Sequence, residues 1–193
     1  MVASDKDMIY TSIFGRRDNL RLDIPCFTTP LGFAMPSMNA KAYKVLSHLF
    51  VPQDSVWVDG NIFTKAKESD ILDRLLGEHD LAAFKHPWRD TPAQEAQTVI
   101  EMGIANKYNV DLMLQLFPQL EKLPLYECGI LLRRNNDLVR QFNEEWWRLI
   151  NLFSSRDQIT FPLAIERTPK LKVRRIEANL REHKFFDFHG HVH

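Results

Sequence analysis

Apolar residues along the chain fall into short strand-like runs that alternate with longer stretches of helical spacing. The strand-like runs are rich in β-branched and aromatic residues and cover residues 8–14, 55–59, 81–84 and 125–132. Apolar side chains recur every three or four positions in residues 39–50, 71–76, 91–103, 110–117 and 137–153, which predicts helices there. This alternation predicts an α/β fold, with a mostly parallel central sheet flanked by helices.

Local start and stop signals support two of these helices. Gly77 follows the apolar stretch 71–76, and glycine is the residue best suited to end a helix. Thr91 is predicted to cap the next helix, with Pro92 in its first turn and Gln94 completing a capping box. Ligands bind beyond the carboxyl ends of parallel strands in such folds, so the loops after the first three strands are the expected place for a site.

The composition limits the classes of function. Of the 193 residues, 25 are Lys or Arg and 25 are Asp or Glu, so the formal net charge is zero. A chain without a basic surplus is not expected to bind nucleic acid. A neutral chain with 45% hydrophobic residues is not expected to be disordered. The length favours one domain over residues 1–193, with a core of about residues 7–166 and a C-terminal extension of about residues 167–193.

The cysteines and the first residues bear on the compartment. Cys26 and Cys128 lie far apart in apolar surroundings, in neither a metal-binding nor a redox spacing, so we expect two buried free thiols in a reducing compartment. The first ten residues contain two Asp and one Lys and no apolar stretch, which argues against a signal peptide. No apolar run approaches the ~18 residues of a membrane span. We therefore expect a soluble, cytoplasmic protein.

The sharpest local motif is VWVDGN, residues 56–61. An apolar strand delivers the carboxylate of Asp59 to its carboxyl end, and the amide oxygen of Asn61 follows two residues later. Oxygen ligands of this kind suit a divalent ion. Asp-Gly-Asn is also a good turn sequence, so an ordinary turn is the alternative interpretation.

A second motif, HPWR at residues 86–89, follows the strand-like run 81–84. Arg89 is suited to hold a phosphate or a carboxylate in a bidentate fork, and His86 is suited to donate to a hydroxyl group. The alternative is a rigid turn in which Trp88 plugs the core. Glu95 follows the predicted helix cap, where it either stabilises the positive end of the helix or pairs with Arg89.

Histidines alternate in the closing segment, at His189, His191 and His193. On an extended chain, a period of two places all three on one side. Neutral imidazoles are good ligands for Mn or Zn, which makes His189 and His191 candidate metal ligands. The alternative is a loose tail, because the last residues of a chain are commonly frayed.

Six short blocks occur in order along most of the chain, at residues 9–15 with 18–20, 44–50, 55–62, 84–89, 125–129 and 155–158. Together they resemble one family of glycosyltransferase-like domains, known from plant mucilage and turgor-related proteins and from bacterial relatives. The block 55–62 also resembles the aspartate motif of GT-A glycosyltransferases, in which a strand-ending acidic motif holds Mn or Mg against a nucleotide-sugar diphosphate. Each block is weak alone, whereas six in the right order are a specific signal.

The resemblance implies a single-domain GT-A-like, Rossmann-like sandwich that transfers a sugar from a nucleotide-sugar donor to an unknown glycan or other hydroxyl acceptor, with Mn or Mg as cofactor. Asp59 would be the main metal ligand and Asn61 a secondary one, which departs from the two-carboxylate form of many GT-A enzymes. His86, Arg89 and Glu95 would bind the sugar or the acceptor. The implied nucleotide-binding residues are Thr11, Phe14, Gly15 and Arg16 after the first strand, and Lys41 at the opening of the next helix. A solvated helix face is the alternative for Lys41.

Three residues are candidates for catalysis. Glu127 lies inside an apolar strand, where a carboxylate is unfavourable unless it is paired or exposed at the sheet end. It is interpreted as a catalytic or sugar-binding group, with an ion pair to an arginine as the alternative. Asp157 by itself indicates a helix N-terminus. Related retaining GT-A enzymes direct an Asp-Gln pair at the donor sugar, which implies that Asp157 contacts sugar hydroxyls and that Gln158 lies beside the anomeric carbon.

Other functions stay open at this point. A hydrolase would use the same residues with water as the acceptor, and both Glu127 and Asp157 are candidates for a general base in an inverting reaction. A non-catalytic nucleotide- or carbohydrate-binding module is favoured by the neutral Asn61 and by the short chain. A dehydrogenase or methyltransferase is disfavoured, because no G-x-G-x-x-G follows the first strand.

Overall fold

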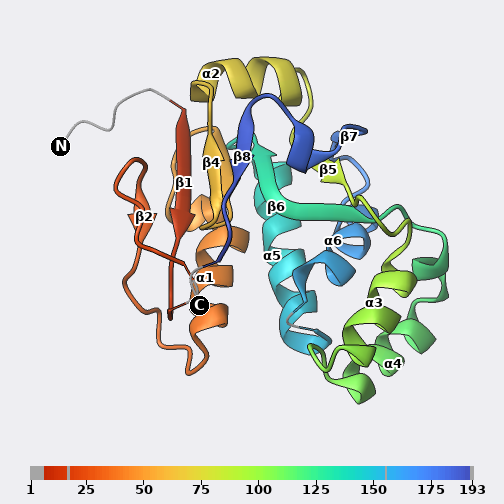
Figure 1. Cartoon of the computed structure of the whole chain (residues 1–193). Helices are drawn as coiled ribbons and strands as arrows, with labels where there is room; N and C mark the ends of the chain where they lie inside the picture. Colours follow the sequence, from red (N-terminus) through yellow and green to blue (C-terminus); the bar gives the residue numbers. More distant parts are fainter. Residues whose placement is uncertain (1–6, 17, 155, 192–193) are drawn as a thin grey trace.

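A twisted six-stranded sheet runs through the middle of the structure, a computed structural model that describes residues 7–16, 18–154 and 156–191 (Figure 1). The strands are β1 (Met8–Ser12), β2 (Cys26–Phe27), β3 (Ser55–Val58), β4 (Ile62–Thr64), β5 (Leu81–Lys85), β6 (Tyr126–Arg133), β7 (Val173–Ile176) and β8 (Phe186–Phe188). The helices are α1 (Pro36–Val45), α2 (Glu68–Ile71), α3 (Pro92–Glu101), α4 (Lys107–Leu116), α5 (Asp137–Leu152) and α6 (Asp157–Glu166). Short helical turns are η1 (Ser47–Leu49), η2 (Leu72–Leu76), η3 (Pro118–Glu121) and η4 (Leu180–Glu182).

The order of strands in the main sheet is β2-β1-β3-β6-β5-β7. Three neighbouring pairs are parallel, and β6 runs antiparallel to β3 and β5 on either side of it. The predicted α/β fold with a mostly parallel sheet flanked by helices is therefore confirmed, with β6 as the exception. Its reversed direction brings the N-terminal end of β6 to the sheet edge at which β3 and β5 end.

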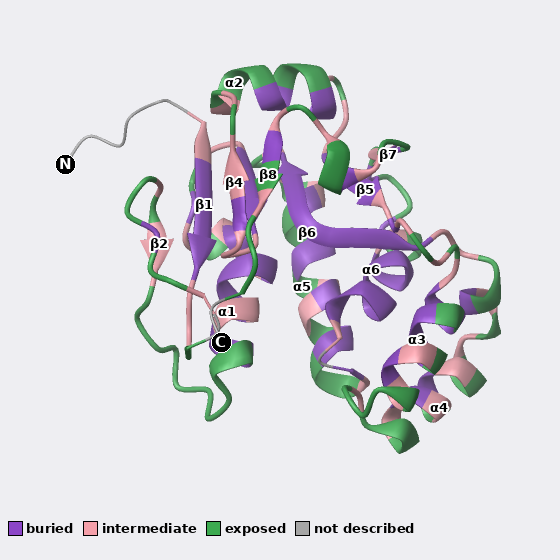
Figure 2. Ribbon diagram, viewed as in Figure 1, coloured by how far each residue is buried: buried purple, intermediate pink, exposed green. Residues whose placement is uncertain are grey.

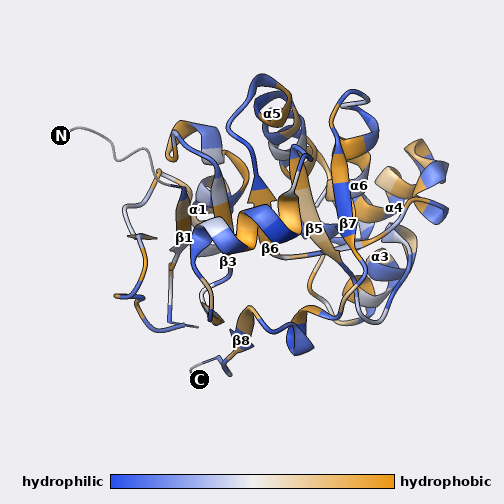
Figure 3. Cartoon of the chain, turned by 90° about the horizontal axis from the view of Figure 1, so that it is seen from above, coloured by the Kyte–Doolittle hydropathy of each residue, from blue (hydrophilic) through white to orange (hydrophobic). Residues whose placement is uncertain are grey.

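Apolar side chains cover both faces of the sheet, since strand residues point alternately to either side. One face packs against α1, α5 and α6 through a core that includes Tyr10, Trp57 and Leu131. The opposite face packs against η2, η4 and β8 through a core that includes Val56 and Leu132. Figure 2 shows β6 buried along its length, and Figure 3 shows α5 and β8 on opposite sides of the sheet.

The C-terminal residues complete both sheets. β7 adds an edge strand in parallel to β5, and β8 pairs with β4 in a separate two-stranded sheet. Four strands, β2, β4, β7 and β8, were not predicted from the sequence pattern. These strands have two to four residues each, too few for an alternating pattern to stand out.

The boundaries of α1 differ from the prediction of a helix over residues 39–50. The helix begins at Pro36, which fits the first helical turn, and it leaves the α conformation at Leu46, where ψ is 42°. A separate turn, η1, follows it. Lys41 therefore lies in the middle of α1, and the expectation that it opens this helix is wrong.

The start of α3 is confirmed in detail. Thr91 accepts a hydrogen bond from the backbone N–H of Gln94, and the Gln94 side chain accepts one from the backbone N–H of Thr91. Such a reciprocal pair satisfies two of the N–H groups that a helix start leaves free.

Replacing Thr91 with alanine is expected to lower the free energy of unfolding by about 1 kcal/mol, since the cap is lost. Thr98→Ala is the matched control, because the Thr98 hydroxyl only bonds back to the carbonyl of Gln94 within the same helix. The urea midpoints of the two variants test this, and an equal midpoint for Thr91→Ala and the wild type would contradict it.

Both cysteines are free, as expected. Cys128 is buried, but Cys26 is only half-buried because β2 lies at the edge of the sheet, so the expectation of two buried thiols is wrong for Cys26. Of the described helices, none has both the length and the apolar character needed to cross a membrane.

Candidate functional site

Charged and polar side chains gather at the sheet edge where β3 and β5 end and β6 begins. Asp59 directly follows β3, His86 directly follows β5, and Glu127 is the second residue of β6. The pairing of β5 with β6 shifts between Ala83 and Phe84, so that Phe84 pairs with Glu127. Such irregularities re-aim side chains next to functional sites. The loops after β3 and β5, which are two of the three loops expected to hold a site, therefore lie at one edge of the sheet.

Lys44, from α1, connects two carboxylates at this edge. Its ammonium group lies 2.7 Å from Oδ2 of Asp157 and 3.3 Å from Oδ1 of Asp59. Lys44 and Asp157 are buried, whereas the side chain of Asp59 keeps 43% of its surface exposed. Burial alone would lower the pKa of Lys44, but the two carboxylates outweigh it and raise that pKa above its ordinary value. Lys44 is therefore a fixed cation between the two aspartates.

The orientation of Asp59 is set by the strands around it. The indole N–H of Trp57 donates to Oδ1 of Asp59 at 2.9 Å, and the backbone N–H of Asp59 donates to the carbonyl of Gly129 on β6. A Cβ at position 129 would lie 3.5 Å from Oδ2 of Asp59 and 3.1 Å from Ile62. A side chain at position 129 would therefore crowd Ile62, while Asp59 itself keeps 43% of its side-chain surface exposed.

Asp157 and Gln158 form the first turn of α6. Burial alone would raise the pKa of Asp157, but Lys41 and Lys44 hold it well below its ordinary value, so this carboxylate is ionised at neutral pH. Gln158 is buried, and among the described residues its side-chain oxygen has no hydrogen-bond partner. Buried polar atoms are nearly always paired, so a free acceptor beside Asp157 marks a place for a water or a ligand hydroxyl.

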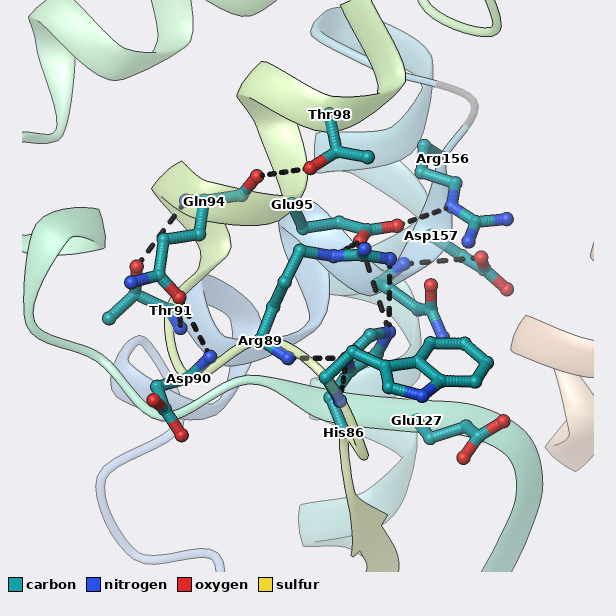
Figure 4. A network of polar contacts seen from close by, with 12 residues as sticks. His86, Arg89, Asp90, Thr91, Gln94, Glu95, Thr98, Glu127, Arg156 and Asp157 are labelled. Carbon is teal, nitrogen blue, oxygen red and sulfur yellow. Dashed lines mark hydrogen bonds and ion pairs between the residues drawn. The ribbon is translucent and has the colours of Figure 1, made fainter. Parts of the chain in front are cut away.

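Next to this pair, Glu95 bridges two arginines. Its carboxylate is fully buried and accepts from Nε of Arg89 and, at 2.9 Å, from Nε of Arg156 (Figure 4). The interpretation that Glu95 pairs with Arg89 is therefore confirmed. His86 lies below them, where its Nδ1 accepts from the backbone N–H of Arg89 at 3.2 Å. Burial lowers the pKa of His86 to about 4, so the imidazole is neutral.

Glu127 forms an ion pair with Arg181, the second residue of η4. Nη1 of Arg181 lies 2.8 Å from Oε1 and 2.9 Å from Oε2 of Glu127. The guanidinium also stacks on the rings of Trp88, at 4.5 Å, and of Phe188, at 5.2 Å. The alternative interpretation of Glu127, an ion pair with an arginine, is therefore confirmed. Trp88 is 66% exposed, so the interpretation of Trp88 as a core plug is wrong.

Burial raises the pKa of Glu127 above its ordinary value, while Arg181 acts against this. Replacing Arg181 with methionine is therefore expected to raise the pKa of Glu127 further. Lys184→Met is the control, since Lys184 lies near η4 but contacts the ring of Phe185 instead. Carbon-detected NMR titration of the Glu127 carboxyl measures the change, and an unchanged pKa in Arg181→Met would show that the pair does not form.

The predicted nucleotide-binding residues are spread over β1, the loop after it, and α1. Thr11 is buried, and among the described residues its hydroxyl has no partner. Phe14 is stacked on Tyr43, with ring centroids 6.0 Å apart, so one of its faces is taken. Gly15 has a φ of +85°, a conformation that favours glycine, and Arg16 is exposed. Of the five, Lys41 is tied electrostatically to the cluster, through Asp157.

Of the four predicted metal ligands, the structure brings Asn61 and His189 into direct contact, whereas Asp59 contacts Lys44 and Trp57. The amide of Asn61 donates to the backbone carbonyl of His189, the ring of His189 lies against Phe63, and Nδ1 of His191 lies 2.7 Å from Asp18. Among residues 7–16, 18–154 and 156–191, no group of three or more His, Cys, Asp or Glu side chains is placed to hold a metal ion. His193 lies outside the described residues.

A cavity of about 500 Å³ lies beside Asn61 and His189 rather than over the charged cluster. Its other walls come from the segment 18–23 that follows the first loop, and from Gly60. A Cβ at position 60 would lie 3.1–3.2 Å from atoms of Asp18 and Ile13. Glycine at this position therefore allows the loop after β3 to pack closely against the loop after β1.

The side chains that form ion pairs within the cluster carry equal numbers of positive and negative charges. The four cations are Lys44, Arg89, Arg156 and Arg181, and the four anions are Asp59, Glu95, Glu127 and Asp157. Sequence reasoning found all four acids and one of the four cations. Lys44 lies three residues from Lys41 on the same face of α1, and no pattern shows which of the two reaches the sheet edge. Arg156 directly precedes the Asp-Gln pair, and this position was the only indication in the sequence that it belongs to the site.

Comparison with known proteins gives the family. The family model of the TOD1/MUCI70 glycosyltransferase-like domain matches residues 28–186 of this chain. A curated relative, "Probable hexosyltransferase MUCI70" from Arabidopsis thaliana, is 26% identical over 138 residues, which are 64% of this chain and 24% of the relative. The chain thus spans about a quarter of the length of that protein.

Solved structures with some similarity include mouse xyloside xylosyltransferase 1 in its apo form, at a TM-score of 0.45 and 14% identity, covering 78% of this chain and 54% of that one. The apo structure of the bifunctional glycosyltransferase WbbM gives a TM-score of 0.41 and 14% identity, covering 79% of this chain and 26% of that one. The family match extends over most of the chain, from the loop before α1 to β8. The chain belongs to the TOD1/MUCI70 glycosyltransferase-like domain family.

Proposed function

We propose that this chain transfers a hexosyl group from a nucleotide-sugar donor to a hydroxyl group of an acceptor, with the charged cluster at the sheet edge as its active site. One observation carries the proposal. In a chain of this family, a buried lysine holds Asp59 and Asp157 together at the carboxyl end of a central strand, and Asp59 remains open to solvent. Clefts at this edge are where open α/β sheets bind their ligands.

On the donor side, Asp157 and Gln158 are proposed to hold the sugar. An ionised carboxylate and an unpaired amide oxygen are both acceptors, and they suit the hydroxyl groups of a hexose. Lys41 is half-exposed and acts electrostatically on Asp157, which suits it to the diphosphate. Thr11, Phe14, Gly15 and Arg16 remain proposals for the nucleotide.

On the acceptor side, Glu127 is the better candidate for a general base. Its pKa is raised by burial, whereas that of Asp157 is lowered, and a base works best when its pKa lies near the working pH. His86, Arg89 and Glu95 are held by one another, so we assign them to positioning this edge and not to proton transfer.

Mn or Mg remains a proposed cofactor. The described His, Cys, Asp and Glu side chains alone do not supply a full set of ligands for it. Asp59 is the proposed main metal ligand, and its carboxylate is partly exposed. However, its Oδ1 already accepts from Trp57 and Lys44. Binding of nucleotide sugars is therefore to be measured both with Mn and with a chelator.

Trp88 is proposed to support the acceptor sugar. Its indole is exposed beside the Glu127–Arg181 pair, and an aromatic ring at that place offers an apolar surface to a pyranose ring. Trp88→Ala is expected to raise the KM for the acceptor about threefold to tenfold and to leave donor binding unchanged, since aromatic stacking contacts are worth about 0.5–1.5 kcal/mol. Tyr108→Ala is the control, an exposed aromatic on α4. Equal acceptor KM values for Trp88→Ala and the wild type would contradict the assignment.

The function is tested by titrating a panel of nucleotide sugars against the protein, with Mn and with a chelator, followed by an assay for released nucleotide. Binding together with acceptor-dependent release supports the transferase. Release at an equal rate with water as the acceptor identifies the hydrolase, and binding without any release identifies the binding module. Failure of the whole panel to bind would refute the donor site.

A further inference from the structure

Apolar side chains form a ridge on the outer face of α4. Tyr108, Leu112 and Leu116 recur every four residues along this helix, and all three are exposed, Tyr108 to 76%. Residues four apart lie on the same side of a helix, so the three side chains make one continuous ridge. Met102 and Ile104, in the segment that leads into α4, are exposed as well. Single apolar residues on a surface need no explanation, whereas a set gathered in one place marks an interaction surface.

The inner face of α4 fixes the helix to the domain. Val110 and Met113 are fully buried and belong to the core on the side of the sheet that carries α5 and α6. The side chain of Asn106 accepts from the backbone N–H of Asn109 and so caps the start of the helix. α4 is therefore anchored and capped, and its outer ridge is not used by the core of its own chain.

The ridge is separate from the proposed active site. α4 lies at the edge of the molecule, next to α3 (Figure 1). The ion pairs of the charged cluster connect α1, α3, α6, η4 and the ends of strands, and within the described part of the chain none of them involves α4. The ridge thus serves a purpose other than holding the cluster together.

Two charges lie beside the ridge. Lys107 and Asp111 are 71% and 39% exposed, and Nζ of Lys107 lies 2.6 Å from Oδ2 of Asp111, one turn further along α4. A second α4 that runs in the opposite direction, related by a two-fold axis level with residues 109 and 110, brings Lys107 of each copy to Asp111 of the other. The same axis sets Tyr108 of each copy against Leu112 of the other. The face is therefore complementary to itself, as an isologous interface requires.

Two further properties of the chain favour a second copy as the occupant. Helices whose contact ridges both follow the four-residue spacing interdigitate at a crossing angle of about −50°, and two identical α4 helices meet this condition. The formal net charge of the chain is zero, so two copies do not repel each other through their overall charge. A strongly charged partner, in contrast, would gain little from a face with one cation and one anion.

We propose that two copies of this chain associate through α4 in a symmetric, antiparallel dimer. Tyr108, Leu112 and Leu116 form its apolar centre, and two ion pairs between Lys107 and Asp111 of opposite copies flank it. A single helix face is smaller than the area of about 800 Å² that each partner buries in a standard stable interface. The expected dimer is therefore reversible, with a Kd on the order of 10 μM.

Sedimentation equilibrium of the purified protein between about 1 and 200 μM measures the association. The mass of the wild type is expected to rise from that of one chain toward that of two over this range. Leu112→Glu places two like charges in the apolar centre and is expected to raise Kd at least about thirtyfold, beyond the range. Leu49→Glu is the matched control, because Leu49 is an exposed leucine on η1, and it keeps the wild-type Kd.

An exchange of charges tests the antiparallel arrangement. Lys107→Glu and Asp111→Lys each replace both ion pairs of the dimer by like charges, and each is expected to raise Kd about tenfold. In an equimolar mixture of the two variants, the mixed dimer regains opposite charges at both positions, so the mixture is expected to associate nearly as tightly as the wild type. Thermal unfolding of every variant shows whether its fold is intact, and the exchange decides where Leu112→Glu does not fold.

A wild type that stays monomeric over the whole range would overturn the proposal. Association that is undiminished in Leu112→Glu would place the contact elsewhere and overturn it as well. So would a mixture of Lys107→Glu and Asp111→Lys that associates no more tightly than either variant alone, because the two α4 helices would then not pair in the antiparallel direction.

Discussion

Lys44→Met is expected to lower the free energy of unfolding at neutral pH by about 3 kcal/mol, because removing one partner of a buried ion pair leaves an uncompensated charge. The charge left behind is that of Asp157, which is buried and lies 2.7 Å from the lysine ammonium. Lys41→Met is the matched control, since Lys41 is half-exposed on the same helix. Its replacement is expected to cost less than about 1 kcal/mol. Urea unfolding of the three proteins measures both differences.

The dependence on pH gives this prediction a second readout. In the wild type the pKa of Asp157 is depressed, so its contribution to stability is present above the unfolded-state pKa of about 4 and is lost as the pH falls toward the folded-state value. In Lys44→Met the desolvation of Asp157 is less offset, its pKa rises, and the variant loses less stability on acidification. The difference between wild type and Lys44→Met therefore narrows as the pH falls. A difference that stays constant or widens would contradict the pairing.

Asp59→Asn is expected to lower kcat/KM for the donor by about 10²–10³-fold, a loss typical of removing one oriented electrostatic group from an active site. The fold is expected to tolerate the change, because the side chain is 43% exposed and the amide oxygen still accepts from Trp57. Asp187→Asn on β8 is the control, an exposed acid in a weak pair with Lys65. Nucleotide release measured under the conditions found for the wild type gives both values.

Full activity of Asp59→Asn would contradict the assignment of this residue. A parallel loss in Tm would assign the effect to folding, so the thermal unfolding of each variant is measured beside its kinetics. Lys44→Met adds a further check, since it removes the cation that orients Asp59 without touching the carboxylate itself.

Patterns in the sequence predicted those parts of the fold that depend on interactions between residues close together in the chain. The capping box at Thr91 forms because its donors and acceptors lie within three residues of each other. Asp59 follows a buried strand because the apolar run ends there, and Asp157 begins a helix. The longer strands were found for the same reason, whereas β7 and β8 depend on partners far away in the chain.

The acids of the site were predicted from the sequence, whereas three of its four cations were not, for a comparable reason. Glu127 stands out because a carboxylate in an apolar strand is unexpected, so its position alone raises the question of a partner. Arg181 answers that question from the C-terminal segment, and no spacing connects the two. Trp88 shows the same limit, since HPWR fixes a turn but not the side of the turn on which the indole lies.

The proposed transfer requires that the edge formed by β3, β6 and α6 binds a nucleotide sugar. The most direct measurement is backbone amide NMR of the protein titrated with the nucleotide sugar that binds best in the panel. We expect the largest shift changes at residues 57–61 and 156–159, with a reduced response in Asp59→Asn. Shift changes confined to the cavity walls at residues 18–23, with residues 57–59 and 156–159 unaffected, would contradict it.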